Sequence, residues 1–176
     1  MGNIKIDDFY HRDPDIEKIA ELYCVTFLTD NYSMEENAIK NINKHANYEG
    51  FIGLKANDDD GNIVGFIYGY TSLPGQFYRE KIAEHLSEED IKTWLFNCFE
   101  FVELAVLPSY RRLGIASKLH HALLESVNYN SAVLTTGMEN RPATNFYRKH
   151  GWEMIKKDVP VISEDNLQAI MGKVLN

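Results

Sequence analysis

Two adjacent arginines, followed by a glycine and small residues, form the part of this chain with the clearest chemical character. The segment Arg111–Ser117 lies between a predicted strand, 97–107, and a helix predicted to follow Gly114. The first N–H groups of a helix lack partners within it, and the helix dipole adds partial positive charge there. The small residues let a ligand approach the backbone, and Arg111 and Arg112 add full charges. This spacing predicts a phosphate-binding loop, although the same residues are also an ordinary way to begin a helix.

Two common phosphate-binding motifs do not fit this loop. A Walker loop needs Lys-Ser/Thr directly after its second glycine, and the dinucleotide fingerprint needs three glycines at fixed spacing. The loop around Gly114 has neither feature. Nucleotide hydrolysis and hydride transfer therefore lose support.

The residues Arg111 to Ala116, preceded by Val106-Leu107-Pro108, resemble the acetyl-CoA motif of the GNAT acetyltransferase superfamily, Arg/Gln-x-x-Gly-x-Gly/Ala. A second signature of that superfamily, Asn-x-x-Ala followed by Phe-Tyr and Gly-Phe/Trp, is similar to the run from Asn140 to Trp152. The resemblance covers nearly the whole chain. It implies one GNAT domain over residues 1–176, an α/β (α+β layered) fold whose central mixed, mostly antiparallel sheet of about seven strands splays at the cofactor site between flanking helices.

The resemblance also implies which residues bind acetyl-CoA as co-substrate. Backbone groups of Leu104 and Val106 would hydrogen-bond the pantetheine arm as a neighbouring strand does. Asn140 would contact the cofactor or the strand end, and it could equally cap a helix beginning near Pro142. The full expected set is Leu104, Val106, Arg111, Arg112, Leu113, Gly114, Ile115, Ala116, Ser117, Asn140 and Tyr147.

The implied reaction is acetyl transfer by direct attack of a primary amine on the thioester, which needs a base and an acid. Tyr147 stands where the family often places the acid, and its alternative is a core tyrosine. Glu100 is the first candidate for the base, because its distance from Arg111 is similar to that of an active-site carboxylate in related enzymes. Glu103 is the second candidate and points the other way unless a bulge shifts the strand. A solvated or salt-bridged carboxylate is the alternative for both.

The acceptor amine is expected to meet aromatic and acidic residues, which attract an ammonium group. Hydrophobic packing is the alternative explanation for each of these side chains. The named acceptor-binding residues are Phe27, Tyr32, Tyr68 and Tyr70, with Asp30, Asn31, Gln76, Phe77 and Tyr78 expected to line the same wall.

The elements that must position these residues can be predicted from periodicity and turn residues. Two amphipathic helices are expected before any long strand, and a hairpin and a broken helical insertion follow them. The predicted helices are 14–28, 34–46, 76–95, the segment from Gly114 through Val127, and 142–150, and the predicted strands are 51–56, 63–70, 97–107, 132–136, 152–157 and 169–174.

Composition excludes several other classes of protein. The formal net charge of −8 opposes nucleic-acid binding and suits a cationic acceptor, although the alternative is that surface acidic residues simply keep the protein in solution. Cys24 and Cys98 are too few for a disulfide framework, and the histidines form no metal-ligand pattern, so no metal is expected. We expect no membrane span and a cytoplasmic location, because the chain has neither a signal-like N-terminus nor a long apolar run.

Two rival functions remain open at this stage. The chain could bind acyl-CoA as a regulatory module without catalysis, or it could act as an interaction domain through the edge of its sheet. Proteins similar to this one commonly form homodimers by pairing such edges, so a homodimer is possible, although the sequence does not fix the oligomeric state.

Overall fold

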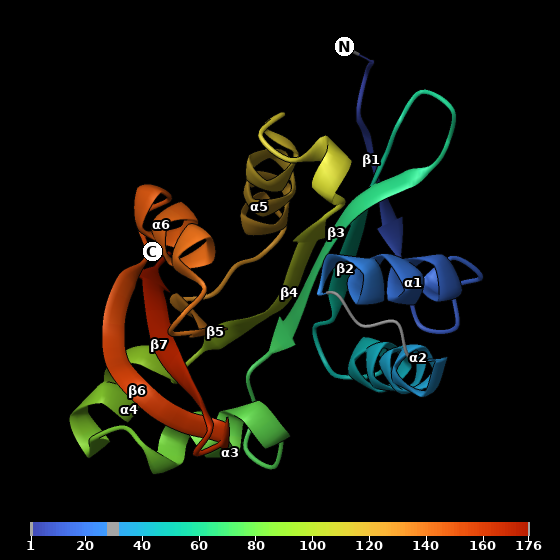
Figure 1. Ribbon diagram of the computed structural model, residues 1–176. Coiled ribbons are helices and arrows are strands. Elements are labelled where there is room, and N and C mark those ends of the chain that lie inside the picture. Colours follow the sequence, from blue (N-terminus) through green and yellow to red (C-terminus); the bar gives the residue numbers. More distant parts are fainter. Residues whose placement is uncertain (1, 28–31, 176) are drawn as a thin grey trace. The chain divides into compact units, whose positions relative to one another are not determined.

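The computed structural model describes residues 2–27 and 32–175, with the side chains of Tyr32 and Ser33 outside that description. Figure 1 shows the helices and strands in chain order. The elements are β1 (Lys5–Phe9), α1 (Ile16–Thr26), α2 (Tyr32–Ala46), β2 (Ile52–Asn57), β3 (Ile63–Thr71), α3 (Phe77–Glu84), α4 (Glu88–Trp94), β4 (Cys98–Val106), the short 3₁₀ helix η1 (Pro108–Tyr110), α5 (Ile115–Glu125), β5 (Ser131–Gly137), α6 (Arg141–Lys149), β6 (Glu153–Ser163) and β7 (Asn166–Val174).

The strands form a seven-stranded sheet in the order β1-β2-β3-β4-β5-β7-β6. β4 and β5 pair in parallel, whereas β1 with β2, β2 with β3, β5 with β7 and β6 with β7 pair antiparallel. This confirms the predicted mixed, mostly antiparallel sheet flanked by helices. The chain divides into two compact units, one of residues 1–70 and 101–127 and the other of residues 71–100 and 128–176.

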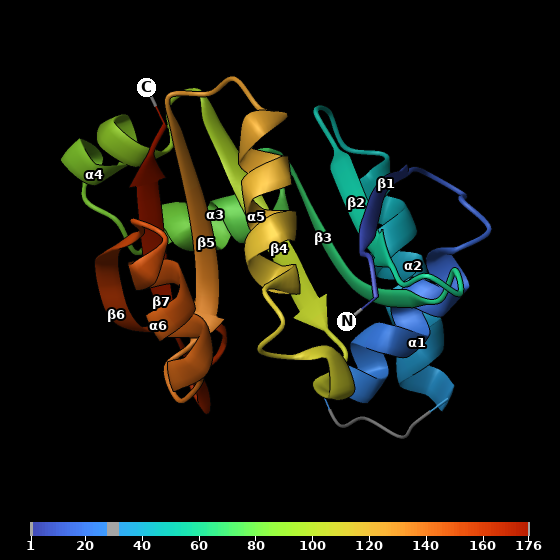
Figure 2. The same ribbon diagram turned by 90° about the horizontal axis from the view of Figure 1, so that it is seen from above.

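The first unit contains β1 to β3, the second half of β4, and the helices α1, α2 and α5. Figure 2 shows α1 and α2 side by side. α1 forms because apolar residues recur at helical spacing and bury one stripe. The core of this unit consists of Phe9, Ile16, Ile19, Ala20, Leu22, Cys24, Ala38, Ile42, Phe66, Tyr68 and Ala105.

β1 is an element that the sequence pattern did not predict. Its five residues contain only two apolar side chains, and the regular alternation that marks a half-buried strand is weak. Pairing with β2, from Lys5 opposite Asn57 to Phe9 opposite Gly53, holds it at the edge of the sheet. The helices α1 and α2 therefore follow a strand, contrary to the expected order.

The second unit contains α3, α4, the start of β4, and then β5, α6, β6 and β7. The expected broken helix at 76–95 is resolved as α3 and α4. The Ser87 side chain caps α4 by accepting a hydrogen bond from the Asp90 N–H at 3.0 Å. These helices supply Ile82, Trp94 and Leu95 to the core of this unit. A Cβ at Gly172 would lie 2.5 Å from the Trp94 ring, so the segment packs directly on β7.

Candidate active site

The Arg111–Ser117 loop begins directly after η1 and has an unusual backbone. Arg111 is extended, Arg112 has a left-handed φ of 62°, and Gly114 has a φ of 80° at the N-cap of α5. A left-handed conformation costs a non-glycine residue roughly 1–2 kcal/mol. The loop therefore holds a strained arginine, Arg112, two residues before the glycine at the start of the helix, and such strain is concentrated at functional sites.

The side chains of this loop divide between solvent and core. Arg111, Arg112 and Gly114 are exposed, and Leu113 is exposed at 39%, whereas Ile115 is buried. Leu113 thus lies at the surface although its side chain is apolar. A Cβ added at Gly114 would meet no atom within 4 Å, so the glycine is needed for its φ rather than for space.

Tyr110 ties this loop to the turn between β2 and β3. Its hydroxyl donates a 2.9 Å hydrogen bond to Asp58, whose carboxylate also accepts from the Asn62 N–H at 2.8 Å. The hydrogen bonds from Asn62 are the main reason that the pKa of Asp58 is lowered, and the bond to Asp58 raises the pKa of Tyr110. The approach to the loop is therefore fixed by polar contacts that the motif did not reveal.

The second half of β4 departs from regular alternation. Phe101 contacts the His120 ring of α5, with ring centroids 5.7 Å apart. Val106 lies on the same side of the strand, because a Cβ added at Gly65 would meet both Val106 and Leu119 of α5. Val102 and Ala105 instead pack against the core under α1 and α2. Residues 102 and 105 cannot share a face by alternation, so the strand contains an irregularity between them.

Glu103 and Leu104 lie at this irregularity, because both stand between Val102 and Ala105. Simple alternation along β4 therefore does not assign the faces of these two residues.

The surroundings of Glu103 favour the protonated form of its carboxyl. The residue is half-buried, and burial of its carboxyl raises its pKa to about 8. Within the described ranges, the Glu103 carboxyl has no hydrogen bond or ion pair. On the same strand, Leu104 is half-buried and Val106 is buried.

Glu100 lies in the other unit and in a different setting. It is only 3% exposed, and burial raises its pKa to about 8, while the Arg79 charge and a hydrogen bond with Ser72 act in the opposite direction. Its Oε2 has no hydrogen-bond partner among the residues that the structure describes. Burial, followed by the nearby Glu100 charge, raises the pKa of the Cys98 thiol to about 12, so this cysteine is not a nucleophile.

Arg79 is a site neighbour that sequence reasoning missed. Its Nη1 donates to the backbone oxygens of Ser72 and Leu95, each at 3.1 Å. No motif marks this arginine, because its partners are carbonyl groups far apart in the chain. Gln76 has a similar role, since its amide accepts from the Leu73 N–H and donates to the Thr71 oxygen, both at 2.9 Å. Gln76 is thus engaged in holding the chain between β3 and α3.

The second signature lies on α6. Asn140 is the N-cap, and its side chain accepts from the Ala143 N–H at 3.2 Å, which confirms the capping alternative. Tyr147, one helical turn after Ala143, is half-buried and contacts the Trp152 ring edge-on, with ring centroids 5.7 Å apart. The Trp152 N–H also donates to the Tyr147 carbonyl at 3.0 Å. Trp152 thus fixes the position of Tyr147.

The residues expected to bind the acceptor are only partly accessible. Tyr68 and Tyr70 are 2% and 1% exposed, and His45 contacts both rings. A hydrogen bond of 2.8 Å joins His45 Nδ1 to the Tyr68 hydroxyl, and burial, with the Lys44 charge, lowers the pKa of His45 to about 4. Tyr68 and Tyr70 thus belong to a neutral aromatic cluster in the core.

The remaining acceptor candidates differ in access. Phe27 is 45% exposed at the end of α1, where its ring contacts Tyr23. Phe77 is exposed and Tyr78 is half-buried, and their rings contact each other. Asp30, Asn31 and the side chain of Tyr32 lie outside the described residues.

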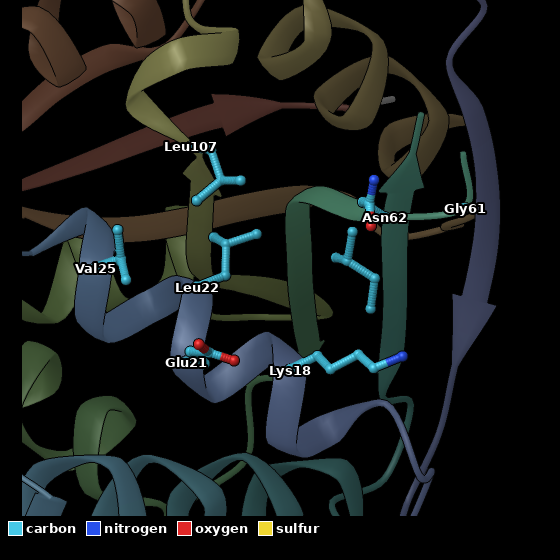
Figure 3. A pocket seen from close by; sticks show the side chains of 8 residues that line it. Lys18, Glu21, Leu22, Val25, Gly61, Asn62 and Leu107 are labelled. Atoms are coloured by element: carbon cyan, nitrogen blue, oxygen red, sulfur yellow. The ribbon is translucent and has the colours of Figure 1, made fainter. Parts of the chain in front are cut away.

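A pocket of about 280 Å³ lies beside α1 in the first unit (Figure 3). Leu22 and Val25 of α1 line it, together with Leu107, which precedes the Arg111–Ser117 loop. Lys18 and Glu21 reach its rim, and none of the expected site residues lines it. The residues that the sequence singled out therefore do not depend on this pocket.

Two negative findings apply to the described part of the chain. Residues 2–27 and 32–175 contain no cluster of three or more His, Cys, Asp or Glu side chains able to hold a metal ion. No helix in these ranges is both long enough and apolar enough to cross a bilayer.

Comparison with known proteins identifies clear relatives. Residues 16–152 match the acetyltransferase (GNAT) family. The GCN5-like protein acetyltransferase Rv2170 of Mycobacterium tuberculosis is 27% identical over 122 residues, which are 64% of this chain and 59% of that protein. This chain thus spans less than two thirds of the length of that relative.

Solved structures show the same fold along the whole chain. The crystal structure of PH1933 from Pyrococcus horikoshii superposes with a TM-score of 0.73 at 20% identity and covers 99% of each chain. Aminoglycoside 6'-acetyltransferase type Ii superposes with a TM-score of 0.70 at 19% identity, covering 98% of this chain and 97% of that one. At these identities the likeness shows the fold alone.

Proposed function

This chain belongs to the GNAT acetyltransferase family, and we propose that it moves the acetyl group of acetyl-CoA to a primary amine. The observation that carries the proposal is the backbone of the Arg111–Ser117 loop. A glycine with φ of 80° caps α5, and two exposed arginines precede it. These features fit the diphosphate of a coenzyme A thioester.

The loop supports binding of the donor in two ways. The first N–H groups of α5 point away from the helix toward the space before it, where the helix dipole favours negative charge. The Arg111 and Arg112 side chains are accessible to add charge-assisted hydrogen bonds. We assign Leu104 and Val106 to the pantetheine arm through their backbone groups, and Asn140 to the donor beside its capping role.

We assign the base to Glu103 in preference to Glu100. A base needs access to the attacking amine, and Glu103 is the less buried carboxyl and has no partner within the described ranges. With a pKa of about 8, about one Glu103 carboxyl in ten is ionised at pH 7, and the share rises with pH. Glu100 is sealed beside Arg79 and Ser72, so we assign it to the architecture of the second unit.

We assign the acid to Tyr147. A phenol can donate its proton to the departing thiolate, which leaves free CoA, and the amine proton passes to the base. Trp152 contacts the Tyr147 ring and bonds its carbonyl, which fixes the helix turn that carries the hydroxyl. The reaction then balances as thioester plus amine giving amide plus thiol.

A cationic acceptor suits this protein. The chain carries a net charge of −8, and Phe27 offers an exposed aromatic face at the end of α1. Tyr68 and Tyr70 support the wall behind such an acceptor rather than contacting it, because almost none of their surface is accessible. Tyr32, which follows Phe27 by five residues, stays in the proposal.

The test is release of free CoA thiol from acetyl-CoA with a panel of amines. Peptide amines and aminoglycosides form two arms, because relatives bear those names, and polyamines and amino acids form two more. We expect one class to accelerate release and Tyr147→Phe to lower kcat by about 100-fold. Firm CoA binding without release across the panel would favour the regulatory module, and absence of CoA binding would contradict the proposal.

A further inference from the structure

A pocket of about 210 Å³ in the second unit carries an unusual concentration of positive charge. It lies between α6 and the start of β6, which Figure 1 and Figure 2 both show as neighbours. Arg141, Arg148 and Lys157 line it, together with Asn145. Met138 and Met154 add an apolar part to its wall.

The three cations reach this pocket because of regular spacing. Arg141, Asn145 and Arg148 stand at positions i, i+4 and i+7 of α6 and so share one face of the helix. Lys157 comes from β6, four residues after the start of that strand. One helix face and one strand therefore present their charged ends to the same hollow.

The charges of this pocket are not neutralised by the protein. In the part of the chain that the structure describes, Arg141, Arg148 and Lys157 make no ion pair, and no acidic residue lines the pocket. All three side chains are exposed. Since the whole chain carries a net charge of −8, this group of three free cations is opposite in sign to the chain as a whole.

We propose that this pocket binds a phosphate group. Arginine offers paired N–H donors that match phosphate oxygens, lysine adds a point charge, and the Asn145 amide can donate a further hydrogen bond. The Thr144 hydroxyl already donates to the Asn140 carbonyl at 3.3 Å and is not needed. Because the two methionines form an apolar wall, the fitting ligand is an organic phosphate ester.

Such a phosphate could come from two sources with the same chemistry. One is a separate phosphorylated metabolite, and the other is the 3′-phosphate of CoA itself. Only the second source rests on the proposed function. Binding measurements without turnover keep the two proposals separable, since a phosphate site can be present in a protein that transfers nothing.

The first arm of the test titrates inorganic phosphate into the ¹⁵N-labelled full chain. We expect the amide signals of 141–148 and 154–157 to shift with phosphate, and the double variant Arg148→Gln/Lys157→Gln to weaken this binding about tenfold. Lys149→Gln is the matched control, because it removes a charge from the same helix without touching the pocket.

The second arm compares CoA with 3′-dephospho-CoA. If the 3′-phosphate is the occupant, dephospho-CoA binds about tenfold more weakly than CoA, and the double variant abolishes the difference. If a separate metabolite is the occupant, both bind equally and the phosphate shifts persist at saturating CoA. The proposal is overturned if the double variant weakens binding of inorganic phosphate no more than Lys149→Gln does, and if the same holds for the affinity that the 3′-phosphate adds to CoA.

Discussion

The two halves of β4 each carry a glutamate whose pKa lies near 8, in different surroundings. Glu100 is almost fully buried, with Arg79 and Ser72 beside it. Glu103 is half-buried, and the residues that the structure describes offer its carboxyl no partner. The comparison teaches that a raised pKa does not by itself identify a base, because burial raises it in both places and only access separates them.

The same contrast extends to the neighbours of each half. Near Glu100, Arg79 bonds two backbone carbonyls and holds the chain segments of the second unit together. After Glu103, the strand leads to η1 and to a loop of exposed arginines with left-handed backbone. We therefore interpret the first half of β4 as architecture and the second half as the part that serves the reaction.

The largest expected effect is a loss of CoA affinity when both arginines of the Arg111–Ser117 loop are replaced. Replacing both loop arginines, Arg111→Gln/Arg112→Gln, removes two charge-assisted contacts and should weaken CoA binding by about 100-fold. Lys118→Gln is the control, because it removes an exposed charge of α5 outside the loop. Calorimetric titration measures both. An unchanged dissociation constant in the double variant would remove the loop from the donor site.

The next effect concerns stability and its pH dependence at Glu100. Its pKa is about 8 in the folded chain against 4.5 as the ordinary value, so the folded state binds more protons between these limits and stability falls as pH rises through them. Glu100→Gln, which carries no charge, should match the wild type near pH 5 and exceed its unfolding free energy by about 1–3 kcal/mol near pH 8.5.

Urea unfolding at both pH values measures this difference. Glu139→Gln, at an exposed carboxyl, is the control and should show the same stability change at each pH. If Glu100→Gln also differed from the wild type equally at both pH values, the carboxyl would not be the buried titrating group described above.

A smaller effect tests the backbone of the loop. Gly114→Ala forces a side chain into φ of 80° and should weaken CoA binding about fivefold, as the loop relaxes to relieve roughly 1 kcal/mol of strain. Gly61 has φ of 82° and equally open surroundings in the turn between β2 and β3, so Gly61→Ala is the matched control. Equal loss of CoA affinity in both variants would indicate a general loss of stability instead.

The smallest effect is expected at Tyr110. Tyr110→Phe removes the hydrogen bond to Asp58 and should raise the KM for acetyl-CoA about twofold, because this partly buried contact supports the loop without touching the donor. Tyr129→Phe removes the comparable bond to Thr71 in the second unit and should leave KM unchanged. Initial-rate kinetics distinguish the two, and an effect of Tyr129→Phe alone would reverse the comparison.

Much of the fold could be predicted from local patterns. The amphipathic stripe of α1, the hairpin of β2 and β3, and the cap at Asn140 follow from rules that act within a few residues. The Arg111–Ser117 loop could also be predicted locally, from two arginines, a glycine and small residues between a strand and a helix, and the structure adds the positive φ of Gly114.

The parts that escaped prediction depend on distant partners. β1 is a strand because β2 offers it an edge, and its own five residues carry little signal. The irregularity between Val102 and Ala105 was considered only as an alternative for Glu103, because strict alternation cannot show that both residues pack on one core. Arg79 acts through backbone carbonyls of Ser72 and Leu95, whose types reveal nothing.

The most direct test of the contrast within β4 is the kcat of acetyl transfer in Glu103→Gln and Glu100→Gln. Rates of CoA thiol release would be measured from pH 6 to 9 with a weakly basic acceptor, so that titration of the amine does not mask the enzyme. We predict that Glu103→Gln lowers kcat about 100-fold and loses the rise through a pH of about 8, whereas Glu100→Gln stays within about threefold of the wild type. A large loss in Glu100→Gln with little change in Glu103→Gln would contradict the account.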